Sequence, residues 1–263
     1  MGRALVAALA GVLALFAGAA ARAQEEVPTP TPPRQEWSFN GVFGSYDQAA
    51  LQRGFQVYKE VCSACHALKY IAYRDLAELG YSDDQIKGFA AQFQVTDGPN
   101  DQGQMYQRAA KPSDMFVSPF PNDQAARAAN NGALPPDMSM LVKAREGGPD
   151  YIQALLTGYV PFDKLTPEQI KAASVTKDDN YNTYFPGHRI AMPPPLADDK
   201  VQYVDGTKAT LGQEVSDVIE FLAWASEPHL EDRNRTGVRV ILFLLAMAGL
   251  MYAVKRQVWA DKH

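Results

Sequence analysis

The sequence predicts a mainly α-helical domain with long irregular loops, followed by a single C-terminal transmembrane helix. Amphipathic stretches with helical spacing recur along the chain, whereas strand patterns are few and short. The uncharged run VILFLLAMAGLMYAV occupies residues 240–254, close to the end of the chain. The long intervals rich in Gly, Pro and Asn lack an apolar core of their own. We therefore expect the loops to wrap a bound apolar group.

The motif Cys62-Ser63-Ala64-Cys65-His66 indicates what that group is. Two thiols at this spacing add across the vinyl groups of one porphyrin, and the adjacent histidine becomes the proximal iron ligand. A zinc half-site and a redox dithiol are the alternatives. Zinc would need two further ligands, but the chain has two cysteines in total and only three other histidines, and no βαβ pattern surrounds the motif. The motif therefore predicts one covalently bound haem c.

Residues 1–23 have the pattern of a cleaved signal peptide. Arg3 precedes an apolar stretch over residues 4–16, and Ala21-Arg22-Ala23 fits the small-x-small cleavage site before Gln24. A membrane anchor is the weaker reading because the apolar stretch is short. Removal of two arginines changes the formal charge from −5 to −7. This acidity argues against a nucleic-acid partner and favours a basic one.

Residues 24–36 form a proline-rich segment containing VPTPTPP, and residues 37–230 are expected to form one domain on the exported side. Within this domain, apolar spacing predicts helices over residues 47–61, 82–93, 137–145, 150–157 and 212–225.

Residues 237–254 are the expected membrane anchor. These 18 residues span about 27 Å as a helix, close to the roughly 30 Å of a hydrocarbon core. A buried core helix is the alternative. Basic residues near both ends and Trp259 are typical of an interfacial belt, but they do not decide the orientation. The exported domain decides it, and this places the tail over residues 255–263 in the cytoplasm.

The second axial ligand is expected to be Met192. It lies in Ile190-Ala191-Met192-Pro193-Pro194-Pro195, where the prolines hold the chain extended and stiff. Thioether ligation raises the haem potential, as an electron acceptor late in a chain requires. His188 is the local rival, and His229 is expected to be interfacial. The remaining candidates are interpreted as core or gap-filling methionines: Met105, Met115, Met138 and Met140.

Gly54 and Phe55 resemble the N-terminal helix of cytochromes c, where a glycine lets two helices cross closely; a tolerated surface glycine is the alternative. Six longer stretches are more specific: LQRGFQVY (51–58), AANNGALPPD (128–137), AREGGPDY (144–151), LLTGY (155–159), YFPG (184–187) with Met192, and FLAWASEP (221–228). Through them the chain, over nearly its whole length, resembles cytochrome c1, the haem c subunit of the ubiquinol–cytochrome c oxidoreductase (cytochrome bc1 complex, complex III).

This resemblance implies a cytochrome c-like haem domain and a set of site residues. Cys62 and Cys65 would make the thioethers, with His66 and Met192 as axial ligands. Asn130 and Pro136 match residues that line the haem pocket, Arg145 matches the arginine that pairs with a propionate, and Tyr151 matches a haem contact. Without the family, Arg145 would be interpreted as part of a solvated helix face. The chain lacks the extra cysteine pair of some bacterial relatives.

The resemblance further implies electron relay without a substrate-turnover site of its own. The subunit would take one electron at a time from the Rieske iron–sulfur protein to a soluble or membrane-tethered cytochrome c, beside cytochrome b in a dimeric complex. It would cross the bacterial inner membrane once, with the haem domain in the periplasm and membrane lipid around the anchor. Acidic pairs at residues 83–84, 97 with 101, 178–179 and 198–199 are candidates for docking, or solvated loops. A cytochrome subunit of another membrane complex and a haem sensor or peroxidase-like protein stay open as alternatives.

Overall fold

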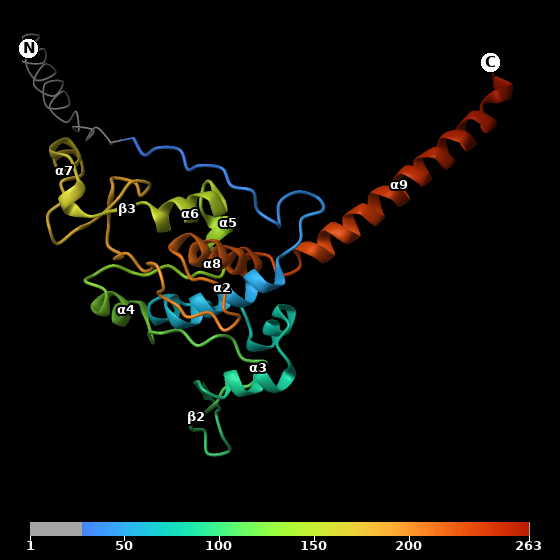
Figure 1. Cartoon of the computed structure of the whole chain (residues 1–263). Helices are drawn as coiled ribbons and strands as arrows, with labels where there is room; N and C mark the ends of the chain where they lie inside the picture. Colours follow the sequence, from blue (N-terminus) through green and yellow to red (C-terminus); the bar gives the residue numbers. More distant parts are fainter. Residues whose placement is uncertain (1–27, 263) are drawn as a thin grey trace, which may run out of the picture.

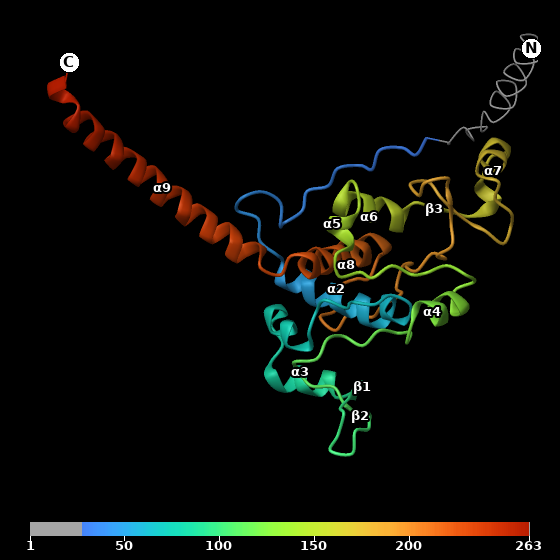
Figure 2. The same cartoon turned by 180° about the vertical axis from the view of Figure 1, so that it is seen from behind.

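A computed structural model describes residues 28–262, and the described part is mainly α-helical with long loops, as predicted (Figure 1). One long helix, α9 (Leu230–Val258), projects away from the remaining elements in both views (Figures 1 and 2). The predicted signal peptide over residues 1–23 lies outside the described residues, as do the first residues of the proline-rich segment.

The domain is built around the crossing of α2 (Gln48–Glu60) and α8 (Leu211–Ser226), which lie side by side (Figure 1). Asp47 caps α2 by accepting from the amides of Ala49 and Ala50. A Cβ atom added to Gly54 would lie 2.0 Å from the carbonyl oxygen of Asp217. Only glycine therefore permits this approach, which agrees with the close crossing expected from the sequence.

Arg53 and the aromatic rings reinforce the same crossing. The Arg53 guanidinium binds Asp217 with two hydrogen bonds of 2.9 Å each, and Asp217 is 1% exposed. Next to it, the rings of Phe55 and Phe221 lie 5.6 Å apart. The largest cluster of buried apolar side chains surrounds these residues and extends to Trp224. This core is the frame on which the haem motif is mounted.

The shorter α-helices lie between these two in the chain. They are α3 (Asp83–Ala90), α4 (Asp123–Ala129), α5 (Leu141–Ala144), α6 (Gly148–Thr157) and α7 (Pro167–Ala173). Ser82 caps α3 with a reciprocal bond to Gln85, and Pro149 occupies the first turn of α6. Short 3₁₀ helices cover Cys62–Ala64, Tyr73–Leu79 and Phe162–Lys164, and another covers Ala260–Lys262 after α9.

The helix expected over residues 137–145 is wrong in its first half, because α5 begins only at Leu141. Asp137 accepts from the backbone amide of Lys69 at 3.0 Å, and the amide of Met138 donates to the carbonyl of Ala67 at 2.8 Å. These long-range bonds replace the first turn of the expected helix. The residues serve instead to attach this loop to the segment that follows the haem motif.

Two small antiparallel sheets complete the described fold. β1 (Gln94–Asp97) pairs with β2 (Tyr106–Ala109) in a hairpin at the far side of α3 (Figure 2). The second sheet has the order β3 (Tyr159–Val160), β4 (Asn180–Asn182) and β5 (Arg189–Ile190). Met192 follows β5 by two residues. We call residues 191–195, which contain Met192 and the three prolines, the strap; the second sheet fixes the position of its start.

Helix α9 has the length and composition of a membrane span. An 18-residue stretch of it has a mean hydropathy of 2.1, and none of that stretch is buried. It begins at Leu230, before the predicted anchor over residues 237–254, because the polar turn ahead of the apolar run is also helical. Glu227 holds the junction by ion pairs to Lys143 at 2.7 Å and to Arg233 at 2.6 Å.

Candidate haem c site

The haem motif forms a tight turn at the C-terminal end of α2. The amides of Cys65 and His66 both donate to the carbonyl of Cys62, at 3.1 and 2.9 Å. Burial raises the pKa of the Cys62 thiol to about 12, with a smaller contribution from Cys65. A thioether sulfur has no proton to lose, so it fits this buried position without the cost of a desolvated charge.

The imidazole of His66 is oriented by the backbone. Its Nδ1–H donates to the carbonyl oxygen of Pro136 at 2.8 Å, since a carbonyl can only accept. Burial lowers the pKa of His66, against the opposing effects of the Pro136 bond and the Asp137 charge. The ring is therefore neutral near pH 7, and the lone pair of Nε2 is free to bind iron.

Several bonds hold the loop that contains Pro136 against the motif. The amide of Lys69 donates to Asp137 at 3.0 Å, and the amide of Tyr70 donates to the Ser139 hydroxyl at 3.0 Å. On the α2 side, the Tyr58 hydroxyl donates to the carbonyl of His66 at 3.2 Å. Met138 is 8% exposed and belongs to the main core. Pro136 thus reaches the site through its carbonyl oxygen, a role that its identity as a proline does not reveal.

Met192 lies in the partly exposed strap after β5, away from the helix that precedes the haem motif. Its carbonyl accepts from the Tyr159 hydroxyl on β3 at 3.1 Å. Burial raises the pKa of Tyr159, so this phenol stays protonated and can donate at any ordinary pH. Sequence reasoning missed Tyr159, because a bond across 33 positions leaves no local pattern.

The other candidates for the second iron ligand are either engaged in other contacts or largely exposed. His188 is 4% exposed, its Nδ1 bonds to the carbonyl of Asn182 at 3.2 Å, and its ring stacks on Tyr181 at 5.3 Å. His229 forms the N-cap of α9. Met105, Met115 and Met140 are exposed by 60%, 51% and 42%, respectively.

Of the three remaining site residues, two are the C-caps of α4 and α5 and one lies on α6. Asn130 ends α4 and donates to the carbonyl of Ala126 at 2.7 Å. Arg145 ends α5, is exposed, and donates weakly to the carbonyl of Ala144 at 3.4 Å. Tyr151 on α6 packs against the main core, and the nearby charge of Arg145 partly offsets the rise that burial causes in its pKa. Arg145 is therefore within electrostatic range of Tyr151.

Within residues 28–262, hydrogen bonds join His66 to Pro136 and Met192 to Tyr159, and no ion pair engages Arg145. His66 is thus held by the loop that contains Pro136, and Met192 by strand β3. Different parts of the fold position the two residues.

Comparison with known proteins identifies the chain. The model of the cytochrome C1 family matches residues 37–262. The chain belongs to the cytochrome c1 family. It is 47% identical to the cytochrome c1 of Rhodospirillum rubrum, covering 99% of this chain and 98% of that protein. It is 45% identical to "Cytochrome c1, heme protein, mitochondrial" of Saccharomyces cerevisiae, over 87% of this chain and 72% of that protein.

A further relative is "Cytochrome b/c1" of Bradyrhizobium diazoefficiens, which is 48% identical over 97% of this chain. The chain spans 39% of the length of that relative. Cytochromes c1 are haem-containing electron-transfer subunits of the bc1 complex, and as a member of the family this chain carries haem c. Family membership and the apolar α9 together indicate anchoring in a membrane.

A cavity of about 370 Å³ adjoins the haem motif at Cys65. Its wall mixes apolar side chains, such as Val117 and Leu134, with polar ones such as Lys69, and neither His66 nor Met192 lines it. The fit to a haem therefore rests on the motif itself. Two thiols at this spacing suit thioether attachment, and the Nε2 of His66 is a suitable nitrogen donor to iron.

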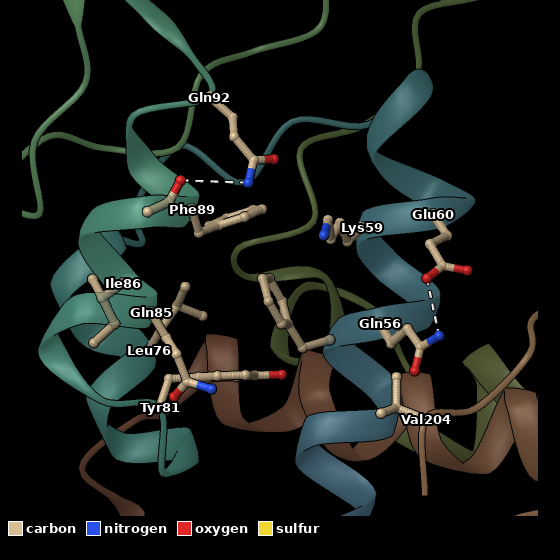
Figure 3. A pocket seen from close by; sticks show the side chains of 12 residues that line it. Gln56, Lys59, Glu60, Leu76, Tyr81, Gln85, Ile86, Phe89, Gln92 and Val204 are labelled. Atoms are coloured by element: carbon tan, nitrogen blue, oxygen red, sulfur yellow. Dashed lines mark hydrogen bonds between the residues drawn. The ribbon is translucent and has the colours of Figure 1, made fainter. Parts of the chain in front are cut away.

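A second cavity of about 440 Å³ lies between α2 and α3, and Figure 3 shows its side chains. Lys59 and Phe89 face each other across it, with the Lys59 ammonium 5.2 Å from the ring centroid. Its wall contains none of the predicted site residues.

The acidic pairs considered for docking are largely engaged in local structure. Asp97 pairs with Arg108, Asp179 binds Arg189 at 2.9 Å, and Asp198 accepts from the amide of Leu211 at 2.8 Å. Asp83 and Asp84 occupy the first turn of α3, where carboxylates favour the helix dipole. These contacts engage one member of each of three pairs, and docking by the acidic residues stays a prediction.

Proposed function

We propose that the chain is the membrane-anchored electron-transfer subunit of a cytochrome bc1 complex. It receives one electron at a time from the Rieske iron–sulfur protein and delivers it to a soluble or membrane-tethered cytochrome c. Cytochrome b carries out quinol oxidation beside it, in a dimeric complex. Family membership supports this role, and the orientation of His66 by Pro136 is the structural observation that carries it.

In this proposal Cys62 and Cys65 would attach haem c through thioethers, and His66 and Met192 would bind its iron. Haem c supplies a one-electron iron couple whose potential a methionine ligand raises. The His66–Pro136 bond fixes the ring and increases the basicity of Nε2. The Tyr159–Met192 bond holds the strap that carries the thioether.

The remaining site residues position the cofactor. Arg145, exposed and close to Tyr151, presents its guanidinium to a propionate, for which the planar fork suits a bidentate bond. Tyr151 supplies a ring at the edge of the main core. Asn130 and Pro136 stand at the two ends of a loop that would cover the His66 side of the haem. The carbonyl of Pro136 also accepts a hydrogen bond from His66.

The proposed location is the bacterial inner membrane, crossed once by α9. Covalent haem attachment outside the cytoplasm and the pattern of the first 23 residues support a periplasmic haem domain and a cytoplasmic C-terminus. The basic residues near the two ends of α9 do not set this orientation, since both ends carry them.

The ligand assignment is tested by Met192→Leu, with Met105→Leu as the control on an exposed methionine. Loss of the thioether should lower the reduction potential by ~0.1 V or more, since axial ligands set haem potentials over a range of about 0.8 V. The reduced variant should also bind carbon monoxide readily. A potentiometric titration that finds the native value in Met192→Leu would exclude this ligand.

The partners are tested by mass spectrometry of what co-purifies with the tagged chain in mild detergent. Cytochrome b and the Rieske protein in stoichiometric amounts are expected. Subunits of an oxidase or a dehydrogenase in their place would retain the haem site and overturn the proposed complex.

A further inference from the structure

Two large apolar side chains occupy the tip of an exposed turn ahead of α2. The amide of Gly44 donates to the carbonyl of Gly41 at 3.2 Å, which places Val42 and Phe43 at the two central positions. Val42 is 68% exposed and Phe43 is 84% exposed. Tight turns are usually made of Gly, Pro, Asn, Asp and Ser, so an apolar pair at the tip needs an explanation.

The base of this turn is fixed to the core of the domain. The amide of Ser45 donates to the carbonyl of Ser38 at 3.1 Å. Trp37 and Phe39 are both buried, and their rings stack at 5.6 Å. A Cβ atom on Gly44 would lie 2.2 Å from the carbonyl oxygen of Phe39. The chain is therefore closely packed up to the tip, and Val42 and Phe43 are displayed from a defined place.

That place is beside the start of α9. The Asn234 side chain lies 3.4 Å from the carbonyl oxygens of both Gly41 and Gly44, and Glu231 accepts from the amide of Tyr46 at 2.9 Å. Figure 1 shows the corresponding blue loop next to the end of α9 that adjoins the domain. The turn is thus attached to the helix at both of its ends.

The depth of this attachment can be compared with the dimensions of a bilayer. Asn234 precedes Gly237, where the apolar segment begins, by three residues or about 4.5 Å of helix. The headgroup layer of one leaflet is roughly 5–8 Å thick. A turn attached at Asn234 therefore lies within the headgroup layer when α9 spans the membrane. At the same level Arg233 and Arg235 are paired with Glu227 and Asp232, so the apolar side chains of the turn are the distinctive groups there.

We propose that Val42 and Phe43 form a second contact with the membrane, inserting at the boundary between headgroups and acyl chains in the leaflet nearest the haem domain. A single helix leaves the domain free to tilt, whereas a second apolar contact beside it restricts that tilt. The turn would thereby hold the haem domain at a set angle to the bilayer. The inference rests on the proposed membrane anchoring by α9.

The test uses the full haem-loaded chain in the detergent-purified complex, reconstituted into vesicles of phosphatidylcholine and phosphatidylglycerol. Phe43→Cys is labelled with a nitroxide, and the unsubstituted chain serves as the background for Cys62 and Cys65. Val204→Cys, at a side chain that is 93% exposed, is the aqueous control. Leu250→Cys in α9 is the lipid control. Each label is scored by relaxation from oxygen, which concentrates in lipid, and from a water-soluble nickel chelate.

The nitroxide at position 43 should be relaxed several-fold more by oxygen relative to nickel than the one at position 204. Equal nickel accessibility at positions 43 and 204, with position 250 in lipid, would overturn this inference alone. Protection of position 43 from both reagents would also overturn it, because a protein subunit would then cover the turn. Nickel accessibility at position 250 would overturn the anchor itself. The haem absorption spectrum confirms that each variant is folded.

Discussion

The fold holds His66 and Met192, the two proposed iron ligands, in different ways. His66 follows α2 directly, and its imidazole and carbonyl are bonded to Pro136 and Tyr58, next to the main core. Met192 lies in a strap after a three-stranded sheet of short strands, and the Tyr159 hydroxyl holds its carbonyl. In the proposed site the histidine would thus be fixed by thioether attachment of its neighbours and by helix packing, and the methionine by the strap and its flanks.

This difference has an energetic meaning. A side chain mounted on a packed core moves only if the core itself opens, whereas a partly exposed strap opens at lower free energy. We therefore expect perturbations of the α2–α8 crossing to abolish folding or haem loading. Perturbations near the strap should leave the protein folded and alter the methionine side alone.

The largest effect is expected for Gly54→Ala. The new Cβ would lie 2.0 Å from the Asp217 carbonyl oxygen, so α2 and α8 would have to separate. The free energy of unfolding should fall by about 3 kcal/mol or more, at the upper end of overpacking effects. Haem incorporation and thermal unfolding measure the loss.

The matched control is Gly88→Ala on α3, where a Cβ meets no atom within 4 Å. This substitution should stabilise the helix by roughly 0.5–1 kcal/mol. Equal behaviour of the two variants would show that the crossing is not the frame of the site.

An intermediate effect is expected for Glu214→Gln, which acts on the segment after the strap. Glu214 is fully buried and accepts from the amide of Val201 at 2.8 Å, but its Oε2 has no hydrogen bond in the described part of the chain. Burial, followed by the charges of Asp198 and Asp199, raises the pKa of Glu214 above its ordinary value of 4.5.

The folded chain therefore holds this proton more tightly than the unfolded chain, and stability falls as the pH rises above 4.5 towards the raised pKa. The native protein should lose stability relative to Glu214→Gln across this window, by at most about 1.4 kcal/mol per pH unit. Unfolding midpoints measured from pH 4 to 7 test this. A constant difference between the two proteins would contradict the raised pKa.

The smallest effect is expected for Tyr159→Phe. One hydrogen bond to the Met192 carbonyl is lost, which costs about 1 kcal/mol. The protein should stay folded and loaded, but carbon monoxide should bind the reduced form faster because the strap opens more often. Tyr106→Phe on β2 is the control, since this ring is 44% exposed on a separate hairpin. Unchanged carbon monoxide kinetics in Tyr159→Phe would show that the strap does not depend on this bond.

The haem motif, the apolar segment and the main helices were predictable from the sequence, because each depends on residues close together in the chain. Cys62, Cys65 and His66 meet within one turn, Asp47 caps its own helix, and the stretch over 240–254 needs only its length and composition. The family resemblance, which rests on longer stretches, is confirmed by the match over residues 37–262.

The tertiary structure alone decided which distant groups meet. The carbonyl of Pro136 accepts a hydrogen bond from His66, and that of Met192 accepts one from Tyr159. Asp137 accepts from the backbone amide of Lys69 and does not begin a helix. The tertiary structure also brought the turn at Val42 and Phe43 beside Asn234. Local propensity acts over a few residues, whereas these bonds form only after the core has brought remote segments together, and they leave no periodic pattern in the sequence.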